Sequence, residues 1–253
     1  MKALLFDIET APTKAYIWDL VTRYVPHGHV AEAGYTLCWA AKWLGKKKVH
    51  YKSTHHHGMK EMLEGIWELL DEADVVIHYN GTKFDVPTLN REFLIHGMRP
   101  PSPFQEIDLY RTAKGRFKLL SNSLAFLAKV LGIEAKLQHK GMDLWTECMA
   151  GEKEAWKMMK AYNIQDVHVL EQAYEKLLPW IQPHPNMGHF VDTEKPVCPT
   201  CGSNHLQSRG SYYTATMRYQ RYQCMEKACG KWSRARTNDL SAHDRRNMLV
   251  GVK

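Results

Sequence analysis

Short apolar runs and longer segments of helical periodicity alternate along the first two thirds of the chain. Leu4–Ile8 is an apolar run that ends among acidic residues, which predicts a buried strand whose end opens onto a site. Tyr35–Trp43 and Val49–Lys52 are separated by a lysine-rich turn and predict a hairpin. Apolar residues at helical spacing over Met59–Ala73 predict a helix, and Val75–Ile77 predicts a further strand. This order of elements predicts an α/β fold.

Further elements are predicted before a proline-rich boundary. The predicted helices share a stop signal of glycine or proline and span Val86–His96, Ser121–Leu131 and Glu152–Leu178. Ile107–Leu109 predicts a short strand between the first two of them. Prolines at 179, 183 and 185 then end the long helix. We therefore predict three parts, which are residues 1–185, 192–236 and 237–253, the last with a short helix around Leu240–Leu249.

Chain length and net charge limit the classes of protein to which this sequence can belong. At 253 residues the chain holds one substantial core and a small appendage, which excludes a multi-domain polymerase or helicase. The net charge is +7, and residues 191–253 carry 11 of the 34 Lys and Arg residues but only 5 of the 27 Asp and Glu residues. The positive surplus therefore belongs to the C-terminal part and makes a polyanion such as nucleic acid a candidate partner.

The apolar segments are short throughout. None approaches the ~20 apolar residues of a membrane span, and the N-terminal run is too short for a signal peptide. Cys38 and Cys148 are isolated, whereas the other cysteines cluster near the C-terminus. These features predict a cytoplasmic protein in a reducing compartment, without a membrane partner.

Four clustered cysteines predict a zinc site. Cys198 and Cys201 form one pair and Cys224 and Cys229 the other, a spacing that lets two tight turns bring four thiolates to one tetrahedral Zn²⁺. A glycine follows each pair, where a tight turn needs a permissive backbone. Tyrosines and threonines between the pairs predict strands. We therefore expect a small β-rich zinc ribbon with one structural Zn²⁺, and disulfides are the alternative.

Basic and aromatic residues alternate in this predicted ribbon. Arg218, Arg221, Arg234 and Arg236 lie among tyrosines and Trp232, a composition that suits contacts with phosphates and stacking on bases. We therefore expect these arginines to bind nucleic acid. The alternative is that the ribbon docks on the rest of the chain or on a partner protein.

Acidic residues at the ends of predicted elements are the candidate catalytic groups. Asp7 and Glu9 leave one face of the first strand, and a divalent cation such as Mg²⁺ or Mn²⁺ would stabilise such a pair. Asp85 follows a strand and a glycine turn, and Tyr162 and Asp166 share one face of the long helix. Each alone has a simpler explanation: a solvated strand end, a helix N-cap, and a half-buried helix.

Together these residues resemble the DEDD superfamily of 3′–5′ exonucleases, which have a ribonuclease H-like fold. The resemblance lies in three motifs in the family's order: Phe6-Asp7-Ile8-Glu9-Thr10, Asn80-x3-Phe84-Asp85 and Tyr162-x3-Asp166. A tyrosine four residues before the last aspartate is typical of the tyrosine-type, or DEDDy, branch. The segment YTLCWAAKWLG and the C-terminal ribbon further resemble stand-alone exonucleases encoded by bacteriophages.

The resemblance implies a mixed sheet flanked by helices and a specific site. Two Mg²⁺ or Mn²⁺ ions are expected to be held by Asp7, Glu9, Asp85 and Asp166, with Tyr162 orienting the attacking water. Asn80 and Phe84 match positions that contact the terminal nucleotides, and the alternative for Phe84 is a core aromatic. The implied activity is release of nucleotides from the 3′ end of single-stranded or 3′-ended DNA by two-metal-ion phosphodiester hydrolysis.

Two other functions stay open at this point. One is a 3′–5′ exoribonuclease, and the other is a catalytically inactive nucleic-acid-binding module that assists replication or recombination. A separate DNA polymerase or replisome protein is a candidate partner. The narrower resemblance implies a phage-encoded protein in the cytoplasm of the bacterial host.

Overall fold

The computed structural model describes residues 1–133 and 141–251. The chain divides into two compact units, Met1–Tyr174 and Glu175–Lys253, and each is described by itself. The predicted boundaries near residues 185, 192 and 236 stay predictions.

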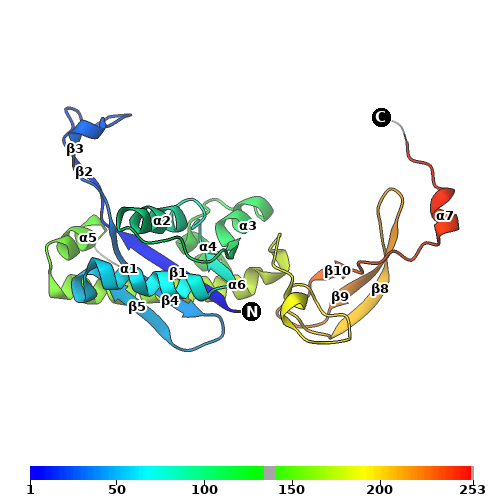
Figure 1. Ribbon diagram of the computed structural model, residues 1–253. Helices are drawn as coiled ribbons and strands as arrows, with labels where there is room; N and C mark the ends of the chain where they lie inside the picture. The colour runs from blue at the N-terminus through cyan, green and yellow to red at the C-terminus, as the bar shows by residue number, and fades with distance from the viewer. Residues whose placement is uncertain (134–140, 252–253) are drawn as a thin grey trace. The chain divides into compact units, whose positions relative to one another are not determined.

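The first unit is built on a five-stranded mixed sheet in the order β5–β4–β1–β6–β7. Figure 1 labels β1, β4 and β5 of this sheet. Its strands are β1 (Ala3–Thr10), β4 (Thr36–Trp43), β5 (Val49–Ser53), β6 (Val75–His78) and β7 (Gln105–Asp108). β1 pairs antiparallel with β4 and parallel with β6, so it lies in the middle of the sheet. Both faces of a central strand are covered, which explains why Leu4–Ile8 is an almost continuous apolar run.

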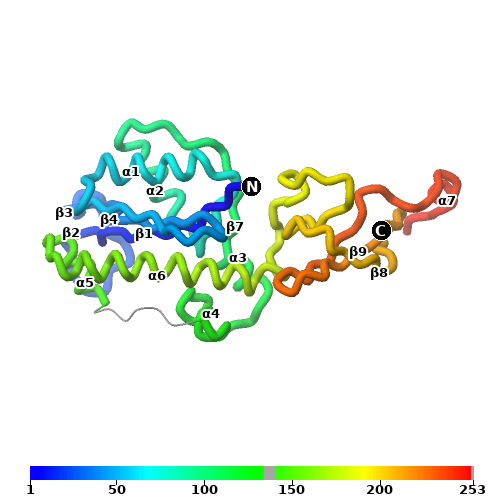
Figure 2. The backbone as a smooth tube through the Cα atoms, turned by 90° about the horizontal axis from the view of Figure 1, so that it is seen from below, coloured from blue at the N-terminus to red at the C-terminus, as the bar shows by residue number. Residues whose placement is uncertain are grey.

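Helices cover both faces of this sheet (Figure 2). One face packs against α1 (Thr54–Glu72) and α2 (Asp85–Ile95), in a core that includes Phe6, Ile8, Trp39, Met62 and Phe93. The other face packs against α5 (Met142–Met149) and α6 (Lys153–Leu177), in a core that includes Cys38, Leu144 and Trp156. The predicted α/β class with a mixed sheet flanked by helices is confirmed.

Most predicted elements of this unit are confirmed, with shifted ends. Gly58 has a φ of 75° and interrupts α1, so its regular part begins at Met59, as predicted. The strand predicted at Ile107–Leu109 is β7, but it ends one residue earlier, at Asp108. The Asp108 side chain accepts the N–H of Tyr110 and thereby starts α3 (Leu109–Arg116). α4 (Leu124–Leu131) begins after Ser123, and Gly132 ends it with a φ of 63°.

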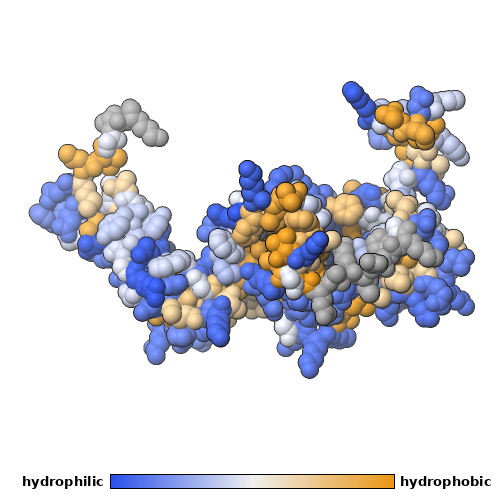
Figure 3. All heavy atoms as spheres, turned by 180° about the vertical axis from the view of Figure 1, so that it is seen from behind, coloured by the Kyte–Doolittle hydropathy of each residue, from blue (hydrophilic) through white to orange (hydrophobic). Residues whose placement is uncertain are grey.

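A small hairpin between β1 and β4 was not predicted. It consists of β2 (Lys14–Ala15) and β3 (Val30–Glu32). The loop between these strands exposes large apolar side chains, among them Tyr16, Trp18 and Leu20. Figure 3 shows hydrophobic residues gathered at the end of this hairpin, at the upper right. Strands of two and three residues are too short to leave an alternating pattern in the sequence.

The second unit contains a three-stranded antiparallel sheet in the order β10–β9–β8. Its strands are β8 (Leu206–Tyr213), β9 (Arg218–Cys224) and β10 (Trp232–Arg234). The strands predicted between the two cysteine pairs are therefore confirmed. The C-terminal helix α7 (Ala242–Arg246) is shorter than predicted and begins at a capping box in which Ser241 and Asp244 bond to each other's backbone.

Candidate functional site

The candidate site lies where β1 and β6 separate. β6 pairs with β1 only over Ala3–Leu5, whereas β4 pairs with β1 as far as Thr10. The second half of β1 therefore runs past the end of its parallel pairing. The carboxyl ends of strands beside such a change of neighbours are the usual place for ligands in α/β sheets.

Three carboxylates converge on this part of β1. One oxygen each of Asp7, Glu9 and Asp166 lie within 4.8 Å of one another. Because Asp7 and Glu9 alternate with the core residues Phe6 and Ile8, they leave the face of β1 that α6 covers. Carboxylates this close repel one another, and their oxygens fit a hard divalent cation such as Mg²⁺ or Mn²⁺.

Asp85 reaches the same segment of β1 by another contact. It is the first residue of α2, and its Oδ1 accepts the N–H of Ile8 at 3.2 Å. The N-cap alternative is wrong, because Phe84 occupies that position and makes no side-chain cap. Burial raises the pKa of Asp85 to about 6, although His78 and the Ile8 N–H oppose the shift. Its expected role as a metal ligand stays a prediction.

Asn163 is part of this site and was not predicted. Its side chain is fully buried, and its Nδ2 donates to Oδ2 of Asp7 at 2.8 Å and to the Asp7 carbonyl at 3.3 Å. The thiol of Cys38 donates to Asn163 Oδ1 at 3.9 Å, which fixes the amide with its nitrogen toward Asp7. Burial and the Glu9 carboxylate raise the pKa of Cys38, so it stays a protonated donor. The sequence gives no signal for a contact across 156 residues.

Tyr162 and Asp166 lie on α6, one turn apart, as the spacing predicts. The Tyr162 side chain is buried, and its ring meets Trp145 edge to face at 6.1 Å. This packing fixes the ring on the α6 side of the sheet, where Asp166 also lies. Its expected role toward an attacking water stays a prediction.

The turn after β6 is held by two side chains. His78 accepts the N–H of Gly81 at Nδ1 (3.1 Å), so its Nε2 carries the proton and donates to Glu106 at 2.9 Å. A Cβ at Gly81 would lie 2.5 Å from the His78 ring, which explains the glycine. Asn80 has a φ of 66°, and its N–H donates to Oδ1 of Asp108 at 2.8 Å. The sequence assigned no function to Asp108.

Phe84 lies immediately before Asp85 with 47% of its surface exposed. The alternative of a core aromatic is therefore wrong. A half-exposed ring beside buried carboxylates is available for stacking on a base. The predicted contacts of Asn80 and Phe84 with nucleotides stay predictions.

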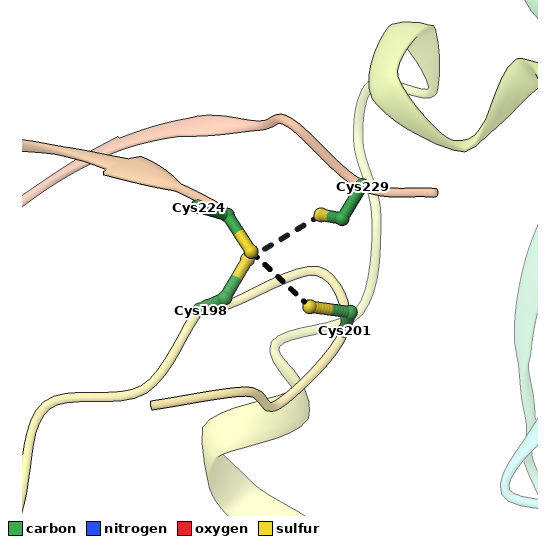
Figure 4. A group of neighbouring side chains, drawn as sticks. All are labelled: Cys198, Cys201, Cys224 and Cys229. Carbon is green, nitrogen blue, oxygen red and sulfur yellow. Dashed lines mark hydrogen bonds between the residues drawn. The ribbon is translucent and has the colours of Figure 1, made fainter. Parts of the chain in front are cut away.

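The four clustered cysteines come together in the second unit (Figure 4). Their sulfurs lie within 4.8 Å of one another, with 3.7 Å between Cys198 and Cys229 and 3.6 Å between Cys201 and Cys224. Ligands on a tetrahedron with Zn–S bonds of about 2.3 Å lie about 3.8 Å apart, so the four thiols fit one Zn²⁺. All four are free thiols, so the disulfide alternative is wrong.

Local backbone structure shapes this cysteine cluster. Gly202 and Gly230 have φ values of 78° and 56°, which confirms the predicted need for a permissive residue after each pair. Burial raises the pKa of the Cys224 thiol to about 11. Burial also acts on Cys198, but hydrogen bonds from the backbone of Cys201 and Thr200 hold its pKa below the usual value. A cation would be needed to keep all four as thiolates.

Two of the four predicted arginines lie on one face of the ribbon sheet. The guanidinium of Arg234 lies 4.0 Å from the ring centre of Tyr219 and 5.6 Å from that of Tyr212. Arg221 lies 4.7 Å from the ring centre of Trp232. The pairings of Arg234 with Arg221 and of Tyr212 with Tyr219 place all five on the same side. We call these five residues the arginine–aromatic face.

The other two arginines, Arg218 and Arg236, are not part of the arginine–aromatic face. Arg218 pairs with Tyr213, leaves the opposite face of β9 and forms an ion pair with Asp239 at 3.5 Å. Arg236 follows β10 and lines a pocket of about 300 Å³ whose lining also includes Arg234 and Tyr222. The four arginines expected to bind nucleic acid are therefore not all on one face of the sheet, because side chains alternate along β9 and place Arg218 opposite Arg221.

A mixed sheet in this order, with carboxylates on its central strand and on a covering helix, is typical of the ribonuclease H-like fold. The chain belongs to the RNase H superfamily, whose family model matches residues 4–178. The match covers β1 through α6 and includes every clustered carboxylate. The fold and this membership support a nuclease function.

Solved structures give the same fold. The chain is similar to the family B DNA polymerase of the hyperthermophilic archaeon Pyrobaculum calidifontis, with 17% identity and a TM-score of 0.54. The similarity covers 70% of this chain and 24% of the polymerase, so the chain spans about a quarter of that protein. No curated protein matches the chain. Among residues 1–133 and 141–251, no helix has the length and apolar character to cross a membrane.

Proposed function

We propose that the protein is a metal-dependent 3′–5′ exonuclease that releases nucleotides from DNA. The observation that supports it best is the cluster of Asp7, Glu9 and Asp166 in an RNase H superfamily domain, with Asp85 on the backbone between the first two. Hydrolysis adds water across the terminal phosphodiester. The products are a nucleoside 5′-monophosphate and a strand one nucleotide shorter that again ends in a 3′-hydroxyl.

The proposal assigns a role to each side chain of the site. Asp7, Glu9, Asp85 and Asp166 hold two Mg²⁺ or Mn²⁺ ions, which supply an acidified water and neutralise charge on the departing 3′-oxygen when bound. Tyr162 orients the attacking water through its hydroxyl, because a phenol donates and accepts hydrogen bonds at neutral pH. These groups come from β1, α2 and α6, three elements that share one core.

The residues of the second motif bind the substrate in this proposal. The exposed ring of Phe84 stacks on a terminal base, a contact worth about 1–3 kcal/mol that does not depend on sequence. Asn80 offers its amide from a turn that Asp108 holds in place. Single-stranded or 3′-ended DNA suits this arrangement, because stacking requires an unpaired base.

The second unit contributes a Zn²⁺ held by Cys198, Cys201, Cys224 and Cys229 in this proposal. Four sulfur ligands leave no open position for water, so this ion is structural. The arginine–aromatic face then binds the strand by phosphate contacts and base stacking. A separate DNA polymerase or replisome protein stays a predicted partner.

The test uses matched DNA and RNA oligonucleotides labelled at the 5′ end, single- and double-stranded. With Mg²⁺ or Mn²⁺ we expect a ladder of DNA products that shorten one nucleotide at a time, and no products in EDTA. A 3′ label should be released as a mononucleotide at once. Preferred degradation of RNA would assign the protein as an exoribonuclease instead.

Variants separate catalysis from binding. Asp7→Ala/Glu9→Ala should reduce cleavage by at least 10³-fold, since metal-dependent catalysis is abolished. A matched control is Glu72→Ala/Asp74→Ala, which removes two acidic residues at the opposite end of the sheet, both bonded to Lys2. If the wild type binds DNA but forms no product under any metal, the inactive accessory module is the correct function.

A further inference from the structure

A basic pocket lies beside the turn that follows β6. It has a volume of about 260 Å³, and its lining joins that turn to α3. The charged and polar side chains around it are Asn80, Lys83, Asp108, Tyr110, Arg111 and Lys114. Among the residues that the structure describes, its lining does not include the carboxylates of Asp7, Glu9 and Asp166. The pocket is therefore distinct from the candidate metal site, although Asn80 and Asp85 belong to the same short segment.

The pocket has a built framework. The buried carboxylate of Asp108 accepts from two backbone N–H groups with one oxygen, that of Asn80 at 2.8 Å and that of Tyr110 at 3.0 Å. One side chain thus ties the turn to the first residues of α3. The ring of Tyr110 packs edge to face on Tyr79, whose hydroxyl donates to the Asn122 carbonyl at 2.7 Å. The walls are positioned before any ligand arrives.

The cationic side chains of this pocket are only partly neutralised. Arg111 Nε lies 3.7 Å from Asp108 Oδ2, and Lys114 lies over the Tyr110 ring at 5.6 Å. Within residues 1–133 and 141–251, no carboxylate lies at ion-pair distance from Lys83 or Lys114. Three cations and one anion leave a local charge of +2, whereas residues 1–190 as a whole carry only +1. The lining of the pocket is therefore net positive.

We propose that this pocket binds an internal phosphate of the substrate strand, on the 5′ side of the scissile bond. The inference rests on the proposed function. The scissile phosphate must lie against the clustered carboxylates, and only one nucleotide extends beyond it. Every other phosphate of the strand is on the 5′ side, so a second phosphate site serves that part of the strand.

The side chains suit a phosphodiester. Arg111 offers a planar set of N–H donors, Lys83 and Lys114 offer mobile ammonium groups, and Tyr110 offers a hydroxyl. The pocket binds the backbone and reads no base, which is consistent with an enzyme that degrades any sequence. It would hold the strand in register while the terminal nucleotide is hydrolysed.

The first experiment measures binding without cleavage. Affinity of a fluorescein-labelled single-stranded oligonucleotide is determined without added Mg²⁺ or Mn²⁺ for the wild type and for Arg111→Gln/Lys114→Gln, at several salt concentrations. We expect a dissociation constant about tenfold higher in the variant at low salt, and a slope of log K against log salt that is smaller by about 0.7 for each phosphate that the variant no longer binds. An unchanged affinity and slope would overturn the proposal.

The second experiment locates the phosphate. Oligonucleotides carry one neutral methylphosphonate linkage at successive positions from the 3′ end. In the wild type we expect one or two internal positions where the substitution weakens binding several-fold, and no such penalty in Arg111→Gln/Lys114→Gln. If the methylphosphonate weakened binding equally at every position in both proteins, the proposed phosphate site would be wrong. The same scan on RNA shows whether the site is shared by both nucleic acids.

A control variant removes the same charge elsewhere. Lys60→Gln/Lys157→Gln changes two exposed lysines on α1 and α6, with 88% and 77% of their side chains exposed. It should bind like the wild type. If the pocket instead takes the released product, nucleoside 5′-monophosphates will compete with the strand in the wild type without any position effect, which overturns the proposal. Binding without Mg²⁺ or Mn²⁺ needs no catalysis, so failure of the proposed exonuclease activity leaves this readout intact.

Discussion

The side chain of Asn163 donates from Nδ2 to Oδ2 of Asp7 over 2.8 Å and to the Asp7 carbonyl over 3.3 Å. The contact joins the middle of α6 to the central strand β1 in a region where both residues have little exposure to solvent. It engages Oδ2 of the Asp7 carboxylate, one of the groups expected to hold a cation. Asn163 is therefore a positioning residue for the carboxylate at the centre of the proposed site.

Replacement of Asn163 should raise the metal requirement of the enzyme. In Asn163→Ala the Asp7 carboxylate loses the hydrogen bond from the Asn163 amide, so we expect activity to fall about 10–100-fold, as for other residues that orient metal ligands. The Mg²⁺ concentration at half-maximal rate should rise at the same time. Steady-state cleavage over a range of Mg²⁺ concentrations measures both.

A matched control for this prediction lies on the same helix. Gln172 is exposed on α6, and Gln172→Ala should leave the metal dependence unchanged. Asn163→Asp is the second test, because a carboxylate against Asp7 adds repulsion and should lower the affinity for the DNA backbone as well. A normal metal profile in Asn163→Ala would show that the residue only fills the core.

The pKa of Asp85 predicts a pH dependence of stability. Burial raises this pKa to about 6, above the ordinary 3.8, so between pH 4 and 6 the folded chain holds a proton that the unfolded chain has released. The contribution of Asp85 to the free energy of unfolding therefore falls as the pH rises through this range, by up to about 3 kcal/mol. Urea unfolding of the metal-free protein at pH 4.5, 6 and 7.5 measures it.

Asp85→Asn separates this effect from other acidic groups. The amide oxygen can still accept the Ile8 N–H and has no charge to bury. We expect the variant to be more stable than the wild type at pH 7.5 in EDTA and nearly equal to it at pH 4. Added Mg²⁺ should stabilise the wild type more than the variant, because the ion binds the ionised carboxylate. If the free energies of unfolding of the two proteins changed with pH in parallel, this would contradict the raised pKa of Asp85.

The two faces of the ribbon sheet predict different effects of arginine substitution. Arg234→Gln removes a cation stacked on Tyr219, so single-stranded DNA should bind several-fold more weakly and with a salt slope reduced by about 0.7. Arg218→Gln removes one charge from the opposite face, where Asp239 already neutralises it, and should have little effect. Fluorescence anisotropy over a salt series compares the two. Equal effects would indicate a general electrostatic attraction.

Zinc content tests the cysteine cluster. We expect one Zn²⁺ per chain in the wild type and in Cys148→Ala, and none in Cys201→Ser, as measured by elemental analysis. Because burial raises the pKa of the Cys224 thiol to about 11, binding releases protons, and the apparent zinc affinity should rise at least tenfold per pH unit near neutrality. A pH-independent affinity would argue against thiolate ligands.

Periodicity predicted the elements whose side chains are buried. β1, β4 and the regular part of α1 carry continuous or regularly spaced apolar residues, because each packs against the common core. α3 was not predicted, since its sequence LYRTAKGR is mostly polar and its start depends on the Asp108 cap. The same cap moved the end of the predicted strand at Ile107–Leu109.

Spacing singled out the acidic residues that cluster in the structure, and the fold determined how they meet. Asp7 and Glu9 were recognised by their alternation on a strand, and Asp166 by its helical distance from Tyr162. Two hydrogen bonds join segments far apart in sequence: Asn163 donates to the Asp7 carboxylate, and the Asn80 N–H donates to the Asp108 carboxylate. Such pairs depend on how sheet and helices pack, and no local pattern encodes them.

The bond from Ile8 to Asp85 links the acidic residues energetically. Ile8 lies between Asp7 and Glu9 in the chain. Any movement of the Asp85 carboxylate therefore shifts the Ile8 backbone and, with it, the side chains of Asp7 and Glu9. The effects of single substitutions should then not add, and Asp85→Ala combined with Glu9→Ala should cost far less than the product of the separate effects. We therefore expect the acidic residues to act as one cooperative unit, in which single substitutions do not produce intermediate levels of activity.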